Sequence, residues 1–297
     1  MDNKLLTFIQ LAESKNFTIA ARKLNLTQPA VSQHIKQLEM QYNVQLFTRV
    51  NNTLKLTKEG EIMLKYALRI ESLYLNLDRK LEDVKKYTKS LVVGITHTAE
   101  SNIAPEILAD YSYENSGIHI KIISDTIRNL YDKLSNYQID LAIIEGTVTS
   151  KKFSTVLLGT DSLVAVMSTN NPLSEKKIVS INDLKKERLI LRTLDSGTTS
   201  LFVHEIEKSG LSVDDFNIYL EIDSVASIKD LVRKNLGVSI LPKSACIREI
   251  KEKYLVALPV ENLNMIRETS LVYVNDNVDR EILEDIVQMY RVKSQNI

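Results

Sequence analysis

The chain has 297 residues, of which 44 % are apolar and 26 % charged, so it is long enough for two or three domains. Its 38 basic and 38 acidic side chains cancel, but residues 1–89 hold 15 basic against 9 acidic ones and the remainder 23 against 29. No apolar run approaches the roughly 18 residues that span a bilayer, the first residues lack the apolar core of a signal peptide, and the single cysteine cannot form an intrachain disulfide. These features exclude a membrane or disulfide-rich protein and predict a cytoplasmic one with a basic N-terminal end.

Two short helices are predicted first. Apolar side chains over residues 5–12 recur at helical spacing. Thr18 is expected to cap a second helix over residues 19–24, and Asn25 can adopt the left-handed conformation of a tight turn between helices.

The third helix, capped by Thr27 and predicted to run to about Tyr42, carries the chemistry of this region. The major groove of DNA admits one α-helix, where glutamine binds adenine edges, serine donates or accepts, lysine reaches guanine or phosphate, and an apolar ring meets a thymine methyl. The candidate base-reading residues are Gln28, Pro29, Ser32, Gln33 and Lys36, on the face opposite Val31, Ile35 and Leu38. The alternative is that this polar face is merely solvated.

Two short strands over residues 44–47 and 54–56, around a turn at 50–53, complete a winged helix-turn-helix domain predicted for residues 1–57. Residues on the elements beside the third helix are expected to contact the DNA backbone or the adjacent minor groove. The candidates are Thr18, Arg22, Thr27, Arg49 and Lys55.

A long helix follows, capped by Thr57 and predicted from Lys58 to about Lys86, within a linker over residues 58–89. Its apolar side chains alternate at spacings of four and three, a narrow stripe that a second copy of the helix would bury. We therefore predict a dimer through Met63, Ala67, Ile70, Tyr74, Leu77, Leu81 and Val84. The alternative is that the stripe packs on the chain's own body.

From residue 90 onward, short apolar runs alternate with amphipathic helices, which predicts an α/β domain with mainly parallel strands and two lobes around a cleft. The predicted strands cover residues 91–95, 118–124, 141–144, 163–167, 189–191, 218–222, 238–241 and 270–274, and the predicted helices 101–114, 126–136, 199–209, 224–236 and 279–291.

The run from Phe17 to Ser32, followed by Ile35-Lys36-Gln37-Leu38-Glu39, Leu46-Phe47-Thr48-Arg49 and Leu56-Thr57-Lys58-Glu59-Gly60, resembles the LysR-type transcriptional regulators. The resemblance is dense over residues 1–65. It implies α/β overall architecture: a winged helix-turn-helix, a linker helix that pairs subunits, and an effector domain over residues 90–297 like periplasmic binding proteins. Lobe I is expected at about 90–160 and 266–297, and lobe II at about 161–265.

Two positions depart from the family pattern. Many members have an arginine where this chain has Asn52, so one ionic DNA contact is missing at that position. Asn43 stands where a glycine usually ends the third helix, and asparagine accepts that conformation.

In the effector domain, candidate ligand-binding residues lie where strands end and helices begin. Free N–H groups at a helix start bind carboxylate, sulfate or phosphate, and hydroxyl groups complete the shell, so an anionic effector is expected. The candidates are Thr96, His97, Thr98, Thr126, Arg192, Ser196, Gly197 and Thr198, with Glu145 and Gly146 as weaker ones. Alternatively, the hydroxyl groups are ordinary helix caps.

An enzyme is not expected. The eight glycines never lie closer than 13 residues apart, so the chain has no glycine-rich phosphate loop, and no hydrolase or metalloprotease motif occurs. We expect no cofactor, and an inert buried thiol at Cys246 rather than a redox sensor. The expected partners are promoter DNA, a small-molecule effector and a second copy, as homodimer or homotetramer, with RNA polymerase as a further candidate. The alternative function is a solute sensor that does not read DNA.

Overall fold

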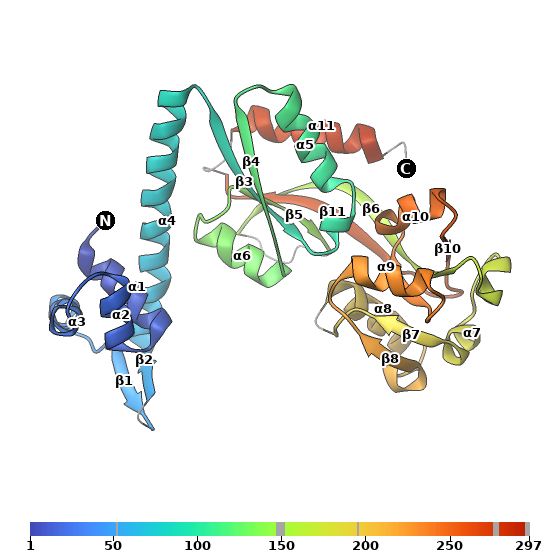
Figure 1. The fold of residues 1–297 in the computed structure, drawn as a ribbon, viewed down its shortest axis with the longest axis horizontal. Coiled ribbons are helices and arrows are strands. Elements are labelled where there is room, and N and C mark those ends of the chain that lie inside the picture. The colour runs from blue at the N-terminus through green and yellow to red at the C-terminus, as the bar shows by residue number, and fades with distance from the viewer. Residues whose placement is uncertain (52, 147–151, 195, 276–278, 295–297) are drawn as a thin grey trace. The chain divides into compact units, whose positions relative to one another are not determined.

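The computed structural model describes residues 1–51, 53–146, 152–194, 196–275 and 279–294. The chain divides into two compact units (Figure 1). The first consists of residues 1–90 with the short segment 135–138, and the second of residues 91–134 and 139–297. Within the described part of the chain, none of the helices is long and apolar enough to cross a membrane.

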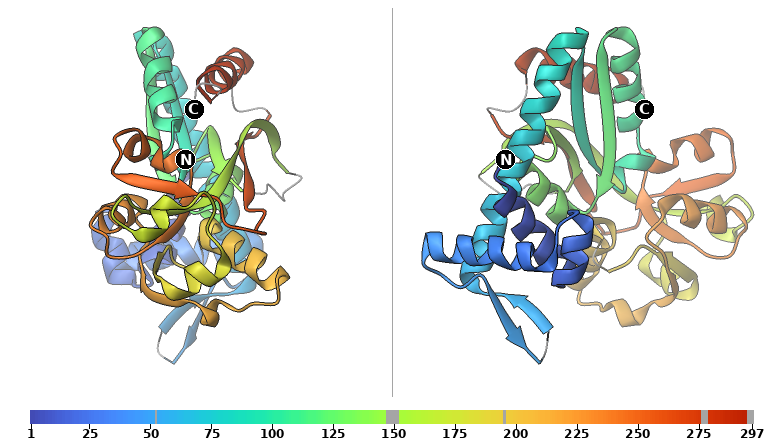
Figure 2. Two further views of the ribbon diagram at one scale, coloured as in Figure 1. Left: turned by 90° about the vertical axis from the view of Figure 1, so that its right-hand side faces the viewer. Right: turned by 60° about the vertical axis from the view of Figure 1, so that its left-hand side comes forward.

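The first unit is a helical cluster with a two-stranded hairpin, followed by a long helix (Figure 2, right). Apolar side chains of all three short helices, the hairpin and the start of the long helix share one core, centred on the buried Phe8, Val31 and Leu38. The elements are α1 (Asn3–Ser14), α2 (Phe17–Lys23), α3 (Gln28–Tyr42), β1 (Phe47–Val50), β2 (Thr53–Leu56) and α4 (Lys58–Lys86).

Helix caps fix these elements, and one differs from the sequence prediction. The prediction that Thr18 caps α2 is wrong: Asn16 does so, because its Oδ1 accepts from the backbone N of Thr18 at 2.9 Å and of Ile19 at 3.1 Å. The left-handed conformations of Asn25 and Asn43 are confirmed, with φ of 54° and 52°.

The hairpin begins later than predicted, at Phe47 rather than Val44. The preceding residues are held against the end of α3 instead, where Val44 N donates to Glu39 O at 3.1 Å and Leu46 N donates to Glu39 Oε1 at 2.8 Å. A backbone N–H engaged by the helix end is not available to a strand partner, so pairing starts after Leu46.

Helix α4 has the predicted bounds and the predicted cap, with Thr57 Oγ1 accepting from Gly60 N at 3.0 Å. Glycine is required at position 60, because a Cβ there would lie 2.2 Å from Leu46 O. The helix therefore starts in direct contact with the segment that leads into the hairpin.

The structure corrects part of the predicted dimerisation stripe. Ala67 is 1 % exposed and Met63 is partly buried, and both pack into the core of their own unit. These two side chains are therefore not available to contact a second copy of the chain. Seven of the exposed apolar side chains follow spacings of four, four and three: Ile62, Tyr66, Ile70, Leu73, Leu77, Leu81 and Val84. The predicted Tyr74 is exposed as well, next to Leu73 in the sequence, and Leu75 is exposed outside this spacing. An 11-residue repeat keeps such a stripe on one side of a nearly straight helix, whereas a heptad pattern drifts around it.

The second unit has two lobes joined by two long strands. Lobe I contains β3 (Lys89–Thr96), η1 (Ala99–Ser101), α5 (Ala104–Glu114), β4 (Ile118–Asp125), α6 (Ile127–Ser135), β5 (Leu141–Glu145) and α11 (Arg280–Ser294). Lobe II contains η2 (Pro172–Glu175), α7 (Ile181–Lys186), β7 (Arg188–Leu191), α8 (Gly197–Lys208), η3 (Val213–Asp215), β8 (Asn217–Glu221), α9 (Val225–Arg233), β9 (Ser239–Pro242), η4 (Ser244–Cys246), α10 (Ile247–Lys251) and β10 (Leu255–Leu258). The joining strands are β6 (Ser154–Ser168) and β11 (Ile266–Tyr273).

The sheet order β10-β6-β11-β5-β3-β4, with β9 also on β6, shows how the lobes connect. The first half of β6 pairs with β11 and its second half pairs with β9 and β10. The prediction of mainly parallel strands is wrong. The pairs β3–β5 and β7–β8 are parallel, but all pairs that β6 and β11 form are antiparallel. The reason is that the chain leaves lobe I along β6 and returns along β11 in the opposite direction.

Candidate functional site

The exposed face of α3 gathers the predicted base-reading residues. Gln28, Pro29, Gln33 and Lys36 are exposed and Ser32 is half-buried, while Val31, Ile35 and Leu38 face the core. Thr27 caps the helix as predicted, its Oγ1 accepting from Ala30 N at 3.3 Å. One helix thus presents amide, hydroxyl and ammonium groups on one side, which suits a DNA groove.

Contacts with α1 hold both α3 and the hairpin in place. Thr7 Oγ1 lies 2.8 Å from His34 Nδ1 and also donates to Asn3 O at 2.8 Å, so the imidazole nitrogen must be the donor toward Thr7. Phe8 of α1 and Phe47 of β1 pack with ring centroids 5.5 Å apart, which fixes the hairpin on α1. Helix α1 therefore positions both α3 and the hairpin.

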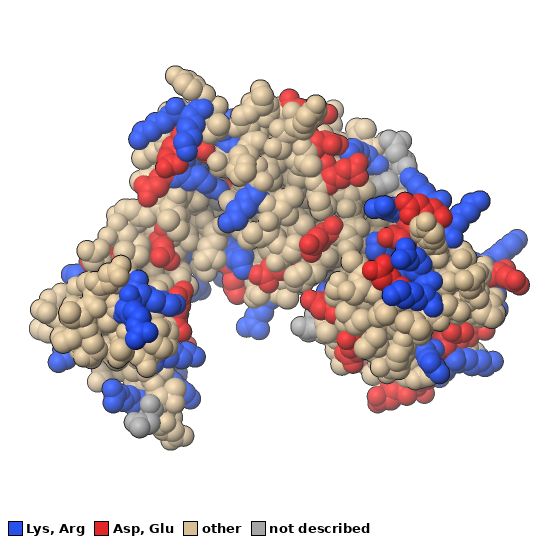
Figure 3. Space-filling view, in the orientation of Figure 1, with Lys and Arg blue, Asp and Glu red and all other residues tan. Residues whose placement is uncertain are grey.

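The residues predicted to meet the DNA backbone are all exposed. Arg22 lies in the last turn of α2, and Arg49 and Lys55 lie on the two strands of the hairpin. On the face that Figure 3 shows, basic side chains lie on the N-terminal unit around this hairpin. Thr18 is exposed in the first turn of α2, and Asn52 lies outside the described residues.

A second candidate site is a cleft of about 920 Å³ in the second unit, lined by both lobes. Seven of the eight predicted effector residues line it: Thr96, His97, Thr98, Thr126, Arg192, Ser196 and Gly197. The sequence prediction missed other lining residues, among them Asp125, Arg128, Tyr131 and Asp223. Asp125 ends β4, Arg128 and Tyr131 lie on α6, and Asp223 follows the end of β8. Asp125 and Asp223 therefore follow the same rule of strand ends that located the predicted residues.

Thr198, the eighth predicted residue, is not part of the cleft wall. It is 1 % exposed at the second position of α8, and its Oγ1 has no hydrogen-bond partner within the described residues. The cap interpretation holds for two other hydroxyl groups: Ser196 Oγ accepts from Thr199 N at 3.2 Å, and Thr126 Oγ1 accepts from Asn129 N at 3.3 Å.

Two groups on the wall differ in their partners. Arg192 is buried and forms an ion pair with Asp223, whose backbone O also accepts from Arg192 Nε at 3.1 Å, so its charge is already balanced. Thr96 Oγ1, by contrast, is buried and has no hydrogen-bond partner within the described residues. An unpaired buried hydroxyl costs stability unless a ligand satisfies it.

Arg267 is the residue that the sequence prediction missed entirely. It is 6 % exposed on β11, and its Nη2 lies 2.7 Å from Glu145 Oε2 and 3.3 Å from Asp161 Oδ2. Its Nη1 donates to Thr98 Oγ1 at 3.3 Å. The sequence did contain a signal for a buried charge at this position: Arg267 is the one arginine in a strand whose other inward residues are small or apolar.

The thiol of Cys246 is buried in the core of lobe II. Burial raises its pKa to about 12, and the thiolate is the reactive form. We expect native protein at pH 8 to resist alkylation by iodoacetamide, whereas protein in denaturant is modified at once. Mass spectrometry of timed samples measures this, and equal rates in both conditions would refute the assignment of an inert thiol.

Comparison with known proteins agrees with this layout. Residues 3–61 match the family model "Bacterial regulatory helix-turn-helix protein, lysR family", and residues 86–293 match "LysR substrate binding domain". The chain is 29 % identical to the "Probable RuBisCO transcriptional regulator" of Trieres chinensis, over 88 % of this chain and 87 % of that one. It is 26 % identical to the HTH-type transcriptional regulator CysL of Bacillus subtilis, over 91 % and 89 %. The structure of full-length CbnR with its target DNA has the same fold, with a TM-score of 0.71 at 18 % identity, covering 98 % of this chain and 99 % of that one.

Proposed function

The chain belongs to the LysR family of transcriptional regulators, and from this premise we propose that α3 reads operator DNA as part of a dimer while the cleft binds a small anionic metabolite. Membership in a family of regulators confirms the expectation that the chain is not an enzyme. In this proposal the protein works in the cytoplasm, where its DNA target is.

The observation that carries the proposal is the exposed polar face of α3. Gln28 and Gln33 are solvent-exposed on a helix whose opposite side is buried, and neither is needed for the core. Arg49 and Lys55 flank it on a projecting hairpin, where phosphate contacts would set the position of the helix and supply salt-dependent affinity.

Selection of bound duplexes from a random-sequence DNA library tests this function without knowledge of the target genes. Full-length protein is expected to enrich an inverted repeat, because a two-fold dimer presents α3 twice. Enrichment of no sequence over the starting library at moderate ionic strength would contradict the proposal.

The exposed stripe of α4 supports the dimer. It carries seven large apolar side chains from Ile62 to Val84, and water contact with so many is unfavourable. A second copy would bury the stripe against itself, which also fixes the distance between the two DNA-reading helices.

Helix starts and hydroxyl groups support an anionic ligand in the cleft. The N-terminus of α8 opens at Gly197 on the cleft wall, and its first N–H groups attract negative charge. Arg128, at the start of α6, adds an exposed cation from the opposite lobe. Thr96 adds the unpartnered hydroxyl, which a carboxylate or sulfate oxygen could accept from.

Replacement of Thr96 by valine should lower the affinity for the effector without lowering the stability of the protein. We expect the free energy of unfolding to stay the same or rise, because valine keeps the shape and removes an unpaired buried hydroxyl. Affinity for the effector found by a thermal-shift screen of organic acids, amino acids and sulfur metabolites should fall about tenfold, the loss of about 1.4 kcal/mol of binding. Denaturant unfolding and titration calorimetry measure the two quantities.

Thr199→Val is the matched control. Its hydroxyl is also buried but donates to Arg192 O at 2.8 Å, so this variant should lose stability. A Thr96→Val protein that binds the effector as tightly as the wild type would show that Thr96 does not touch it.

A further inference from the structure

The two strands that join the lobes carry a buried ionic cluster between them. Arg267 on β11 has 5 % of its side chain exposed, Glu145 on β5 has none, and Asp161 on β6 has 10 %. One cation thus serves two carboxylates in a region that water hardly reaches. Such clusters depend on further hydrogen bonds to their charged groups. Within the described residues, Glu145 Oε2 has only its ion pair with Arg267, and Arg267 Nε has no hydrogen-bond partner.

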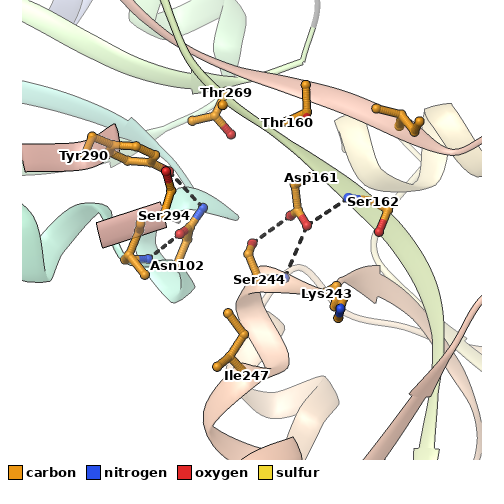
Figure 4. A pocket seen from close by; sticks show the side chains of 13 residues that line it. Asn102, Thr160, Asp161, Ser162, Lys243, Ser244, Ile247, Thr269, Tyr290 and Ser294 are labelled. Carbon is orange, nitrogen blue, oxygen red and sulfur yellow. Dashed lines mark hydrogen bonds between the residues drawn. The ribbon is translucent and has the colours of Figure 1, made fainter. Parts of the chain in front are cut away.

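The other carboxylate oxygens accept hydrogen bonds from neutral donors, and these donors belong to different lobes. Glu145 Oε1 accepts from Asn102 Nδ2 of lobe I at 2.8 Å. Asp161 Oδ2 accepts from Ser244 Oγ of lobe II at 2.7 Å, and its Oδ1 accepts from Ser162 N at 2.8 Å. Figure 4 shows Ser244 turned toward Asp161, with Asn102 and Tyr290 paired on the other side of the same hollow.

The cluster also reaches the effector cleft, because Glu145 and Thr98 both line it. Arg267 Nη1 donates to Thr98 Oγ1, so this oxygen is an acceptor and its own proton is directed elsewhere. Thr98 lines the cleft, where its O–H can donate to a ligand oxygen. A hydroxyl that donates to an anion becomes a better acceptor, which strengthens its bond from Arg267.

We propose that Arg267 transmits occupancy of the cleft to lobe II, along the path Thr98, Arg267, Asp161 and Ser244; this inference rests on the proposed function, in which the cleft holds an anionic effector. A ligand that draws Arg267 toward Thr98 weakens its hold on Asp161. The hydrogen bond from Ser244 to Asp161 then becomes the stronger of the two contacts that this carboxylate makes with Ser244 and Arg267, and the position of lobe II changes with it. Arg267 acts as a positioning residue and does not touch the ligand.

Hydrogen exchange on the full-length chain, read by mass spectrometry, tests the path with and without inorganic sulfate as the probe. Without sulfate, Ser244→Ala should speed exchange over residues 239–246 by about tenfold, since a bond to a charged group is lost. Ser180→Ala is the matched control, because Ser180 Oγ also donates to a carboxylate of lobe II, Asp183 Oδ2, at 2.8 Å, within the start of α7. It should leave residues 239–246 unchanged.

With sulfate, wild-type protein should gain protection at the start of α8 and also change its exchange over residues 239–246. Ser244→Ala should keep the first effect and lose the second, which a merely structural role would not produce. Arg267→Lys keeps the charge but lacks the planar fork that joins three partners, so it should also lose the second effect.

Two results would overturn the path. One is an equal response of residues 239–246 to sulfate in the wild type and in Ser244→Ala; the other is equal ligand-free exchange there in Ser244→Ala and Ser180→Ala. Absence of sulfate protection at the α8 start of the wild type contradicts the anionic effector itself, and the ligand-free comparison still decides whether Ser244 ties lobe II to the cluster.

Discussion

Gln28→Ala should strongly reduce sequence preference in DNA binding while leaving nonspecific binding nearly intact. Gln28 opens α3 on its exposed face, where a side-chain amide can bind an adenine edge with two hydrogen bonds. Each such contact contributes about 1–3 kcal/mol of discrimination, and a dimer makes it twice. We therefore expect the ratio of affinities for the selected duplex and a scrambled duplex to fall by roughly thirtyfold or more.

Competition binding at fixed ionic strength measures that ratio. The phosphate contacts of Arg49 and Lys55 are untouched by the substitution, so the salt dependence of nonspecific binding should not change. Gln41→Ala is the matched control, an exposed glutamine in the last turn of the same helix. If Gln28→Ala protein protects the selected site in a footprint as the wild type does, the assignment of α3 as the reading helix fails.

Leu73→Glu should dissociate the dimer. Leu73 lies in the middle of the exposed stripe on α4, and its burial against a second copy would contribute about 1.5–3 kcal/mol per subunit. Loss of two such side chains and burial of two like charges should weaken the dimer at least about a hundredfold. Analytical ultracentrifugation measures the dissociation constant, and binding to the selected inverted repeat should fall in parallel.

Leu75→Glu provides the comparison, because Leu75 is exposed on the same helix but lies on the side away from the stripe. The heptad pattern predicted from sequence excludes Leu73, whereas the 11-residue pattern of the structure includes it. Equal dissociation by the two variants would therefore argue against this stripe as the dimer interface.

The N-terminal unit could be predicted almost completely from the sequence because its signals are local. Thr27, Asn25 and Asn43 are caps and turn residues whose side chain or φ angle decides the helix boundary within a few positions. Thr18 shows where the prediction of caps from local sequence fails. Asn16 and Thr18 are both good caps, and only the approach of the backbone N–H groups to Asn16 Oδ1 selects between them.

The error in the α4 stripe has a different cause. A periodic apolar pattern shows which side chains avoid water, but not whether they do so inside their own chain or against another. Met63 and Ala67 fit the heptad pattern and are buried by α4's own unit. The distinction depends on the approach of α4 to the helical cluster, which Gly60 permits and the pattern does not contain.

In the second unit, strand ends located the cleft, but the sequence could not reveal what lies behind it. Thr98, Glu145, Asp161 and Arg267 are up to 169 residues apart, and only the return of β11 between β5 and β6 brings them together. Strand pairing was misjudged for the same reason, since the direction of β6 and β11 follows from the crossing between lobes.

The late position of β11 and α11 in the chain also bears on synthesis at the ribosome. β11 fills the gap between β5 and β6, and α11 supplies Ile282, Ile286 and Tyr290 to the core of lobe I. Lobe II is one uninterrupted segment between the two crossings, so it can fold as soon as it emerges, whereas lobe I waits for the last part of the polypeptide. A premature stop codon shortly before residue 266 would therefore leave lobe I open, with its apolar strands exposed to chaperones and proteases, beside an intact lobe II.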